Sequence, residues 1–298
     1  MKQAILVTAY KNFGHLERII RRFDDDFVFY IHIDKKSLLS RGELDKFLGD
    51  ERVLFLSRKY KVNWGGFNHL QSILLLCSEA VRNEEVGYMH LISGLDFPIK
   101  SCAYFKEYIS RNRGKEFLEH FEMPVDFWPY GGMDRLTNYN FYDLFNGKTD
   151  KGLKRIYQLI ELQRRLRISR GIPANFPKLY GGSTWWTLSA ACLKYVVGYI
   201  QGHPSYLSRF RFTFCAEETF FQTILLNSPY KESICNDNLR YVLWEEKNGN
   251  YPANLDETDF AAIQQSSGLF ARKFEYPVSE GLLEKISDAL HNGQMTQR

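Results

Sequence analysis

Short apolar runs alternate with segments of helical periodicity in the first third of the chain, and this pattern limits the fold more than any other feature. Strands are expected at residues 3–8, 27–33, 53–56 and 88–93, with helices at 15–22 and 68–81. Continuous apolar runs are typical of parallel strands that are covered on both faces. The alternation therefore predicts an α/β fold with a mostly parallel central sheet flanked by helices.

The pattern stops between Pro124 and Tyr180, where the chain is rich in aromatic residues, Gly and Pro, and returns afterwards. A basic helix is expected at 151–170, strands at 184–188, 241–244 and 269–274, and helices at 190–200, 217–226 and 280–290. A chain of 298 residues is expected to form one domain. The first 110 residues have the alternation of a nucleotide-binding half.

The composition excludes some partners and leaves others open. The 39 Lys and Arg exceed the 35 Asp and Glu by only four, which is too slight an excess to indicate nucleic acid binding. Aromatic residues make up 15% of the chain. They either supply platforms for sugar rings or fill the core. The five cysteines, an odd number without a CxxC pair, are expected to be reduced and not to hold a structural zinc ion.

The start of the chain, Met1 to Tyr10, contains one Lys and a short apolar run. This is the pattern of a first strand and not of a secretion signal. No stretch approaches the ~20 apolar residues that a transmembrane helix needs. We therefore expect a cytoplasmic protein.

Two adjacent carboxylates, Glu217 and Glu218, begin a helix whose remaining residues are mostly apolar. The positive end of the helix dipole favours their ionised form, which suits a general base. The alternative is that acidic residues stand in the first turn for their interaction with the dipole alone.

Seven segments in order resemble the family of core 2 and I-branching N-acetylglucosaminyltransferases and peptide O-xylosyltransferases. They are FYIHIDKKS (29–37), NWGGFNHLQS (63–72), HLISGLDFPIKS (90–101), GGSTWWTLS (181–189), AEETFFQTILLNSP (216–229), DNLRYVLW (237–244) and LFARKFE (269–275). The resemblance implies a GT-A-like glycosyltransferase fold. It also implies inverting transfer of a sugar, N-acetylglucosamine or xylose, from a UDP-sugar to a hydroxyl of a glycan. Residues 111–298 would then form the acceptor-binding and catalytic half.

The resemblance implies a role for each matching residue. Glu218 is similar to the catalytic base, and Glu217 takes at most a supporting role. Asp34 resembles the contact to the uridine, although a strand-end Asp that caps a turn is the alternative. Arg272 and Lys273 are similar to the basic pair that faces the donor diphosphate, with a solvated basic pair as the alternative.

The remaining candidates carry weaker matches. Asp96 either orders the loop near the donor sugar or is a turn residue, and Trp64 and Gly65 either approach the donor or form a structural turn. One of Trp185 and Trp186 is expected to stack on acceptor sugar while the other lies in the core. Arg240 is a candidate donor contact and Glu119 a candidate acceptor contact.

No convincing metal-binding DxD motif is found. Asp24 and Asp26 match its letters but precede a strand, and residues 93–96 read Ser-Gly-Leu-Asp. A fixed protein cation can stabilise the charge on the leaving phosphate as a metal would. We therefore expect metal-independent transfer with no cofactor besides the UDP-sugar, as the resemblance also implies.

Animal members of the family have membrane anchors and disulfides. The lack of a visible anchor here favours a bacterial-type enzyme of cell-surface polysaccharide synthesis that uses a glycan or lipid-linked oligosaccharide acceptor. The basic helix at 151–170 either rests on the inner face of an anionic membrane or is a solvated helix packed by its apolar side. A carbohydrate-binding or scaffold protein that keeps the fold without transfer is the rival function.

Overall fold

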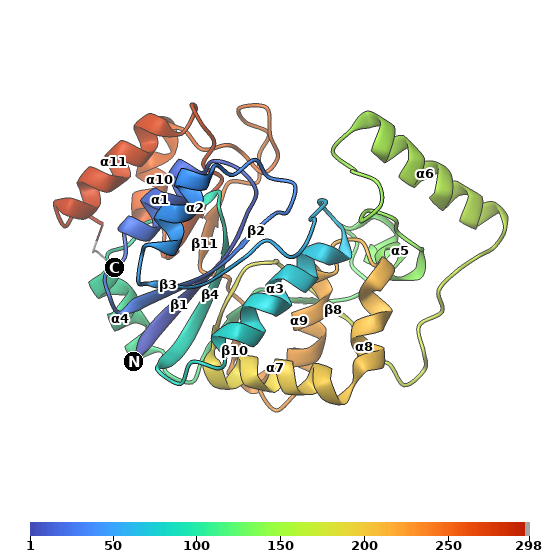
Figure 1. The fold of residues 1–298 in the computed structure, drawn as a ribbon. Helices are drawn as coiled ribbons and strands as arrows, with labels where there is room; N and C mark the ends of the chain where they lie inside the picture. The colour runs from blue at the N-terminus through green and yellow to red at the C-terminus, as the bar shows by residue number, and fades with distance from the viewer. Residues whose placement is uncertain (296–298) are drawn as a thin grey trace.

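A seven-stranded sheet forms the centre of the molecule in the computed structural model, which describes residues 1–295 (Figure 1). Its strand order is β10-β6-β9-β4-β1-β2-β3. The strands are β1 (Lys2–Ala9), β2 (Phe27–Ile33), β3 (Val53–Ser57), β4 (Val86–Ser93), β6 (Glu116–Leu118), β9 (Trp186–Ser189) and β10 (Ile234–Cys235). Within it β9 runs antiparallel to both of its neighbours, and the other pairs are parallel.

Helices cover both faces of this sheet. The α-helices among residues 1–295 are α1 (Phe13–Arg21), α2 (Arg41–Leu48), α3 (Phe67–Ala80), α4 (Cys102–Arg111), α5 (Asp134–Thr137), α6 (Asp150–Arg165), α7 (Ala190–Gly202), α8 (Pro204–Arg209), α9 (Glu217–Leu226), α10 (Phe260–Gln265) and α11 (Glu280–His291). The apolar sides of α3, α7, α8 and α9 pack in one core, and those of α1, α4, α10 and α11 pack in the other. The predicted α/β class, with a mostly parallel central sheet flanked by helices, is confirmed.

The two-residue period of a strand explains how one sheet serves two cores. Along β1, Ala4 and Leu6 belong to the core under α3, whereas Ile5 and Val7 belong to the core under α1. Successive side chains point to opposite faces of a strand, so both sets must be apolar. This accounts for the uninterrupted apolar runs of β1, β2 and β4 that the sequence shows.

The sheet joins the two halves expected from the sequence. Strand β9 pairs with β4, and β6 pairs with β9, so strands from beyond residue 110 extend the sheet of the first half. Helix α11, at the end of the chain, packs in the same core as α1. The expected halves therefore share both the central sheet and a hydrophobic core.

A second sheet of three strands, in the order β11-β12-β5, lies beside the first. Its strands are β5 (Asp96–Pro98), β11 (Arg240–Val242) and β12 (Phe270–Arg272), and β12 runs antiparallel to β5 with Arg272 opposite Asp96. A two-stranded sheet pairs β7 (Phe121–Glu122) with β8 (Tyr180–Gly181). The β12 pairing brings the C-terminal LFARKFE segment back to the end of β4.

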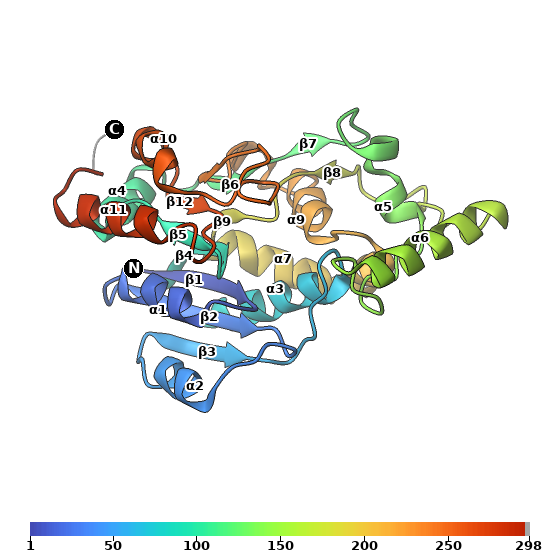
Figure 2. The ribbon, with the colours of Figure 1, turned by 90° about the horizontal axis from the view of Figure 1, so that it is seen from above.

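The basic helix is shorter than the sequence analysis expected. Helix α6 ends at Arg165, and Arg167 has a positive φ of 53°, which the right-handed helix does not allow. Arg170, expected inside the helix, is buried and donates to the backbone carbonyl of Asn138 at 3.3 Å and to that of Arg209. The helix packs by Ile156 and lies at the edge of the molecule, beyond α5 (Figure 2). Contact with a membrane stays a prediction.

All five cysteines are free thiols, as expected, with Cys77, Cys192 and Cys215 buried. Among residues 1–295, no helix combines the length and the apolar character needed to cross a bilayer.

Trp186 provides a test of the core between the sheet and α9. Its side chain is fully buried, with its ring centroid 5.3 Å from that of Phe221. We expect Trp186→Ala to lower the free energy of unfolding by about 3–5 kcal/mol, because the large cavity left behind cannot collapse completely. Urea denaturation followed by circular dichroism measures this change. Trp244→Ala is the matched control, since Trp244 is 62% exposed, and its cost is expected to stay below about 1 kcal/mol. Equal costs would contradict the assignment of Trp186 to the core.

Candidate active site

The candidate site lies where β1, β2 and β4 end, at the carboxyl edge of the parallel strands, which is where α/β sheets bind ligands. Asp34 directly follows β2 and is buried. Its Oδ1 atom accepts hydrogen bonds from the backbone N–H groups of Lys36 and Val62, each at 3.0 Å. Asp34 therefore ties the loop after β2 to the loop after β3, and its role as a uridine contact stays a prediction.

Asp96 and Arg272 form a buried ion pair across the β5–β12 ladder. The Arg272 Nε atom lies 3.0 Å from Asp96 Oδ1, although the two atoms are not aligned as a hydrogen bond. The other carboxylate oxygen of Asp96 accepts from the Ser93 backbone N–H, which closes the turn after β4. The Arg272 guanidinium also lies over the Trp185 ring, 4.3 Å from its centroid. Asp96 thus anchors Arg272 as well as the turn.

Lys273, the next residue, has no carboxylate within 4.0 Å among the residues that the structure describes. Burial, together with the neighbouring charges of Arg272, Lys148 and Lys11, lowers the pKa of its ammonium group to about 8. Cations that gather at the carboxyl edge of the sheet without a shared counter-ion favour a polyanionic ligand. The expected diphosphate partner of Lys273 fits this environment.

Arg240 lies elsewhere. Its guanidinium is bound to the protein itself, donating to the backbone carbonyls of Leu91 at 2.8 Å and Trp186 at 3.2 Å. It also lies over the Phe270 ring, 4.7 Å from the centroid. Burial lowers its pKa to about 9. These contacts favour a structural role, in which Arg240 joins the two sheets, over the predicted contact to the donor.

Both tryptophans are buried in the core that also contains the apolar sides of α3 and α9. Trp186, the first residue of β9, is fully buried against Phe221 of α9. Trp185 is 7% exposed, and the Arg272 guanidinium lies over its ring. The expected division into one core tryptophan and one outward tryptophan is therefore not seen, and stacking of Trp185 on acceptor sugar stays a prediction.

Glu218 stands at the start of α9, as the sequence predicts. Its Oε2 atom accepts a hydrogen bond of 2.6 Å from Arg135, and 29% of its side chain is exposed. Burial raises the pKa of the carboxyl group, and the adjacent Glu217 raises it further, whereas Arg135 lowers it. Arg135 favours the ionised carboxylate, and burial makes that carboxylate more basic. Both properties suit a general base. The negative charge of Glu218 also acts on Arg272. It raises the pKa of Arg272, which burial lowers.

Arg135 is a site residue that the sequence analysis missed. It belongs to the short helix α5, and its guanidinium lies 3.5 Å from the centroid of Trp128 and 5.3 Å from that of Phe214. This packing fixes the guanidinium where it meets Glu218. No sequence signal identifies it, because α5 lies within the region without periodicity and the contact joins residues 83 positions apart.

Glu217 points away from this contact. Its side chain is 5% exposed, and its Oε1 atom lies 2.9 Å from the Nδ1 atom of His69 on α3. Glu217 therefore links α9 to α3. A direct acceptor contact is not favoured by this burial, and the expected supporting role stays a prediction.

The turn at Trp64 to Gly66 supports the start of α9. The Gly65 carbonyl accepts from the Cys215 backbone N–H at 3.0 Å, and a Cβ atom on Gly65 would lie 2.4 Å from the Phe214 ring. The positive φ of 76° also requires glycine. Trp64 is 51% exposed, with its ring edge-on to Phe214 at 5.2 Å. Gly65 thus has a structural role, and Trp64 presents an exposed ring beside the helix that carries the base.

Glu119 follows β6 and accepts from the Asn238 side chain, and burial raises the pKa of its carboxyl group. Its backbone carbonyl lies against Gly182, where an added Cβ atom would be 1.9 Å away. Gly182 in turn donates its N–H to the Glu218 carbonyl at 2.8 Å. Glu119 is therefore connected to the start of α9 through Gly182, and its contact with acceptor stays a prediction.

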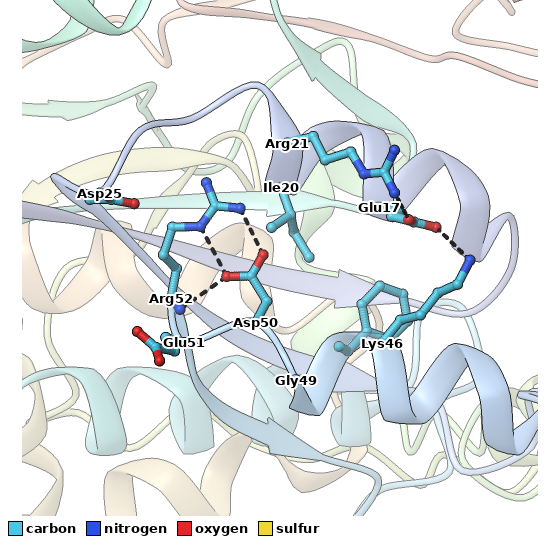
Figure 3. Close-up of a pocket in the computed structure, with 10 residues that line it drawn as sticks. Glu17, Ile20, Arg21, Asp25, Lys46, Gly49, Asp50, Glu51 and Arg52 are labelled. Carbon is cyan, nitrogen blue, oxygen red and sulfur yellow. Dashed lines mark hydrogen bonds and ion pairs between the residues drawn. The ribbon is translucent and has the colours of Figure 1, made fainter.

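A pocket of about 520 Å³ lies between α1 and α2, beside the start of β3 (Figure 3). Asp50 binds Arg52 there at 2.7 Å, Glu17 binds Arg21 and Lys46, and Asp25 and Glu51 also line the pocket. None of the site residues expected from the sequence lines it.

Comparison with known proteins decides the family. The family model described as Core-2/I-Branching enzyme matches residues 4–264. The chain belongs to the Core-2/I-Branching enzyme family. This confirms the resemblance carried by the seven sequence segments.

Relatives of this Core-2/I-Branching family member include xylosyltransferase 2 of Rattus norvegicus, 28% identical over 96% of this chain and 33% of the relative. Xylosyltransferase 1 of Mus musculus is 27% identical over 95% of this chain and 29% of the relative. The chain spans about a third of the length of these curated relatives. They are animal proteins, so they do not support the expected bacterial-type assignment.

Among solved structures, S. aureus TarS 1-349 is 11% identical with a TM-score of 0.41, covering 89% of this chain and 63% of that chain. Mouse xyloside xylosyltransferase 1 in its apo form is 10% identical with a TM-score of 0.39, covering 91% of this chain and 97% of that chain.

The DxD letters at Asp24 and Asp26 do not form part of the site. Both carboxylates bind Lys106 on α4, at 2.9 and 2.5 Å, in the turn before β2. Across residues 1–295 no group of three or more His, Cys, Asp and Glu side chains is arranged to hold a metal ion. Metal independence stays a prediction for this family member.

Removing the Arg135 charge tests how Glu218 is tuned. We expect Arg135→Met to raise the pKa of Glu218, because burial and Glu217 then act without an opposing cation. A carboxyl group whose folded-state pKa lies above its unfolded value of 4.5 costs stability as pH rises from the unfolded to the folded pKa. The variant should therefore lose more stability than the wild type as pH rises above 4.5. NMR titration of carboxyl ¹³C signals, with Glu218→Gln for assignment, measures the pKa.

Arg165→Met is the control for this experiment, because Arg165 is exposed and pairs with Glu161 at 3.2 Å on α6. It should leave the pKa of Glu218 unchanged. An unchanged pKa in Arg135→Met would show that Arg135 does not tune the carboxyl group.

Proposed function

We propose that this protein is an inverting glycosyltransferase that moves a sugar from a UDP-sugar to a hydroxyl group of a glycan or lipid-linked oligosaccharide. The observation that carries the proposal is that one site contains both a basic group suited to a diphosphate and a carboxylate suited to a general base. Lys273 is a half-buried ammonium with no carboxylate within 4.0 Å among residues 1–295, and Glu218 is a carboxylate of raised pKa at the start of α9. The Core-2/I-Branching family match supports this reaction class.

The proposed reaction assigns one step to each environment. Glu218 takes the proton of the acceptor hydroxyl while that oxygen attacks the anomeric carbon from the face opposite the nucleotide. The bond from the anomeric carbon to the β-phosphate oxygen breaks, and UDP leaves with the electron pair. Lys273 and Arg272 stabilise the charge on the departing diphosphate, which removes the need for a metal ion. The proton on Glu218 then returns to water.

The transferred sugar is proposed to be xylose or N-acetylglucosamine. The relatives named xylosyltransferase 1 and 2 favour xylose. Glu218 acts on the acceptor hydroxyl and Lys273 on the diphosphate, and both groups take part in the reaction with either sugar. A carbohydrate-binding protein without transfer is the second candidate, because a binding function would keep the same aromatic and basic residues.

Calorimetric titration of UDP, UDP-xylose and UDP-N-acetylglucosamine with a chelator present tests the donor site. Binding is expected without metal, because Lys273 and Arg272 supply the positive charge.

Glu218→Gln should bind donor as the wild type does while transfer falls by orders of magnitude, since the amide cannot take a proton. Binding only with manganese would refute the metal-free site, and equal transfer by Glu218→Gln would remove Glu218 from the mechanism. Donor binding without transfer to any glycan would favour the second candidate.

The pKa of Lys273 predicts how UDP binding depends on pH. The ammonium group loses its charge as pH rises through about 8, so the Kd for UDP should rise about tenfold between pH 7 and pH 9. The stability of the free protein should instead increase with pH. Because the pKa of Lys273 is about 8 in the folded protein and 10.5 in the unfolded chain, the charged ammonium group lowers stability below pH 8. This cost is lost between pH 8 and 10.5.

Titrations of UDP and of uridine at several pH values measure the effect. Uridine, which carries no phosphate, should show no such dependence. Lys273→Arg is the matched variant, because guanidinium stays charged through pH 9 and should abolish the trend. A trend that persists in Lys273→Arg would assign the titration to another group.

A further inference from the structure

The segment between α5 and α6, residues 138–149, returns to the end of β1 and brings Lys148 to the candidate donor site. The Lys148 Nζ atom lies 5.4 Å from the centroid of the Tyr10 ring. The Lys11 Nζ atom lies at the same distance from that ring. Two ammonium groups, one from each half of the chain, therefore share one exposed tyrosine at the carboxyl edge of the sheet.

The cations around Tyr10 differ in whether they have a partner. Lys11 is paired with Glu275, and Arg272 is paired with Asp96. Neither Lys148 nor Lys273 has a carboxylate within 4.0 Å among residues 1–295. Lys148 is also one of the charges that lower the pKa of Lys273. Lys148 is exposed, so its ammonium group is accessible to solvent. Two ammonium groups that repel each other beside Tyr10 suit an anion that binds both.

The position of Lys148 is set by contacts that do not use its ammonium group. The Asn63 side chain donates to the backbone carbonyl of Tyr142 at 2.7 Å, and the Tyr142 ring lies 4.5 Å from that of Phe214. The Asn146 side chain accepts from the Lys148 backbone N–H at 3.1 Å, and Thr149 caps α6 through its side chain. The segment is thus fixed by its backbone, which leaves the Lys148 ammonium free to meet a ligand.

We propose that Lys148 is a third cation for the donor diphosphate, supplied from the second half of the chain. The proposal rests on the proposed function, because it assumes that the donor binds at Lys273. It adds that residues 138–149, which pack on Phe214 just before the base helix α9, also contact the leaving group. Lys148 then stabilises the diphosphate in the bound donor and in the departing UDP.

Calorimetric titrations of UDP, UMP and uridine into Lys148→Met, with chelator present, test this role. The variant keeps an apolar side chain of similar length and loses the charge. We expect about a tenfold weaker Kd for UDP, a smaller loss for UMP, and no change for uridine, because a charge-assisted contact to the terminal phosphate is lost. The control Lys151→Met, on the exposed side of the first turn of α6, should bind all three ligands as the wild type does.

The pH dependence of UDP affinity is a second measurement, and a purely structural role of Lys148 would not change it. Without the Lys148 charge, the pKa of Lys273 should rise, and the decline of UDP affinity should move to higher pH. Wild-type affinity of Lys148→Met for UDP would overturn the role of Lys148 and leave the proposed function standing. An equal loss of affinity for UDP and for uridine would overturn it too, because Lys148 would then support the fold and not contact the diphosphate. Absence of UDP binding in the wild type would instead refute the donor site itself.

Discussion

The buried ion pair between Asp96 and Arg272 is the contact on which the candidate site depends. It fixes β12, near the end of the chain, against the short strand β5 that follows β4. Removing one partner of such a pair leaves an uncompensated buried charge, which typically costs about 3–5 kcal/mol. Because Lys273 follows Arg272 directly, the same pair sets where the unpaired ammonium stands relative to the carboxyl edge of the parallel strands.

The placement of Lys273 opposes the stability of the free protein. Its depressed pKa means that folding partly buries a charge that has no carboxylate partner among residues 1–295, and the charges of Arg272, Lys148 and Lys11 increase the cost. Groups of this kind gather at functional sites, where a ligand supplies the missing charge. In the proposed donor site, the region around Tyr10 would exchange some stability of the ligand-free state for affinity toward the diphosphate.

The sequence predicted those elements whose signal is local. The runs of β1, β2 and β4 and the helix that starts at Glu217 were placed almost to the residue, because burial on both faces or on one stripe determines their composition. Strand β5 and helix α4 were missed, since a three-residue strand ending at Pro98 has no period to detect. Arg135 and Lys148 were missed for a different reason. Each acts through a contact with a residue more than 80 positions away, and only the packing of the irregular 124–180 region creates it.

The two charged parts of the site are kept apart by their own partners. Glu218 is bound by Arg135, and Arg135 is held between the rings of Trp128 and Phe214, so the carboxylate has a fixed cation of its own. Asp96, and not Glu218, neutralises Arg272. If Glu218 paired with Lys273 instead, the proposed diphosphate site would lose its free charge. The arrangement of separate partners lets a carboxylate of raised pKa and an unpaired ammonium exist at one edge of one sheet.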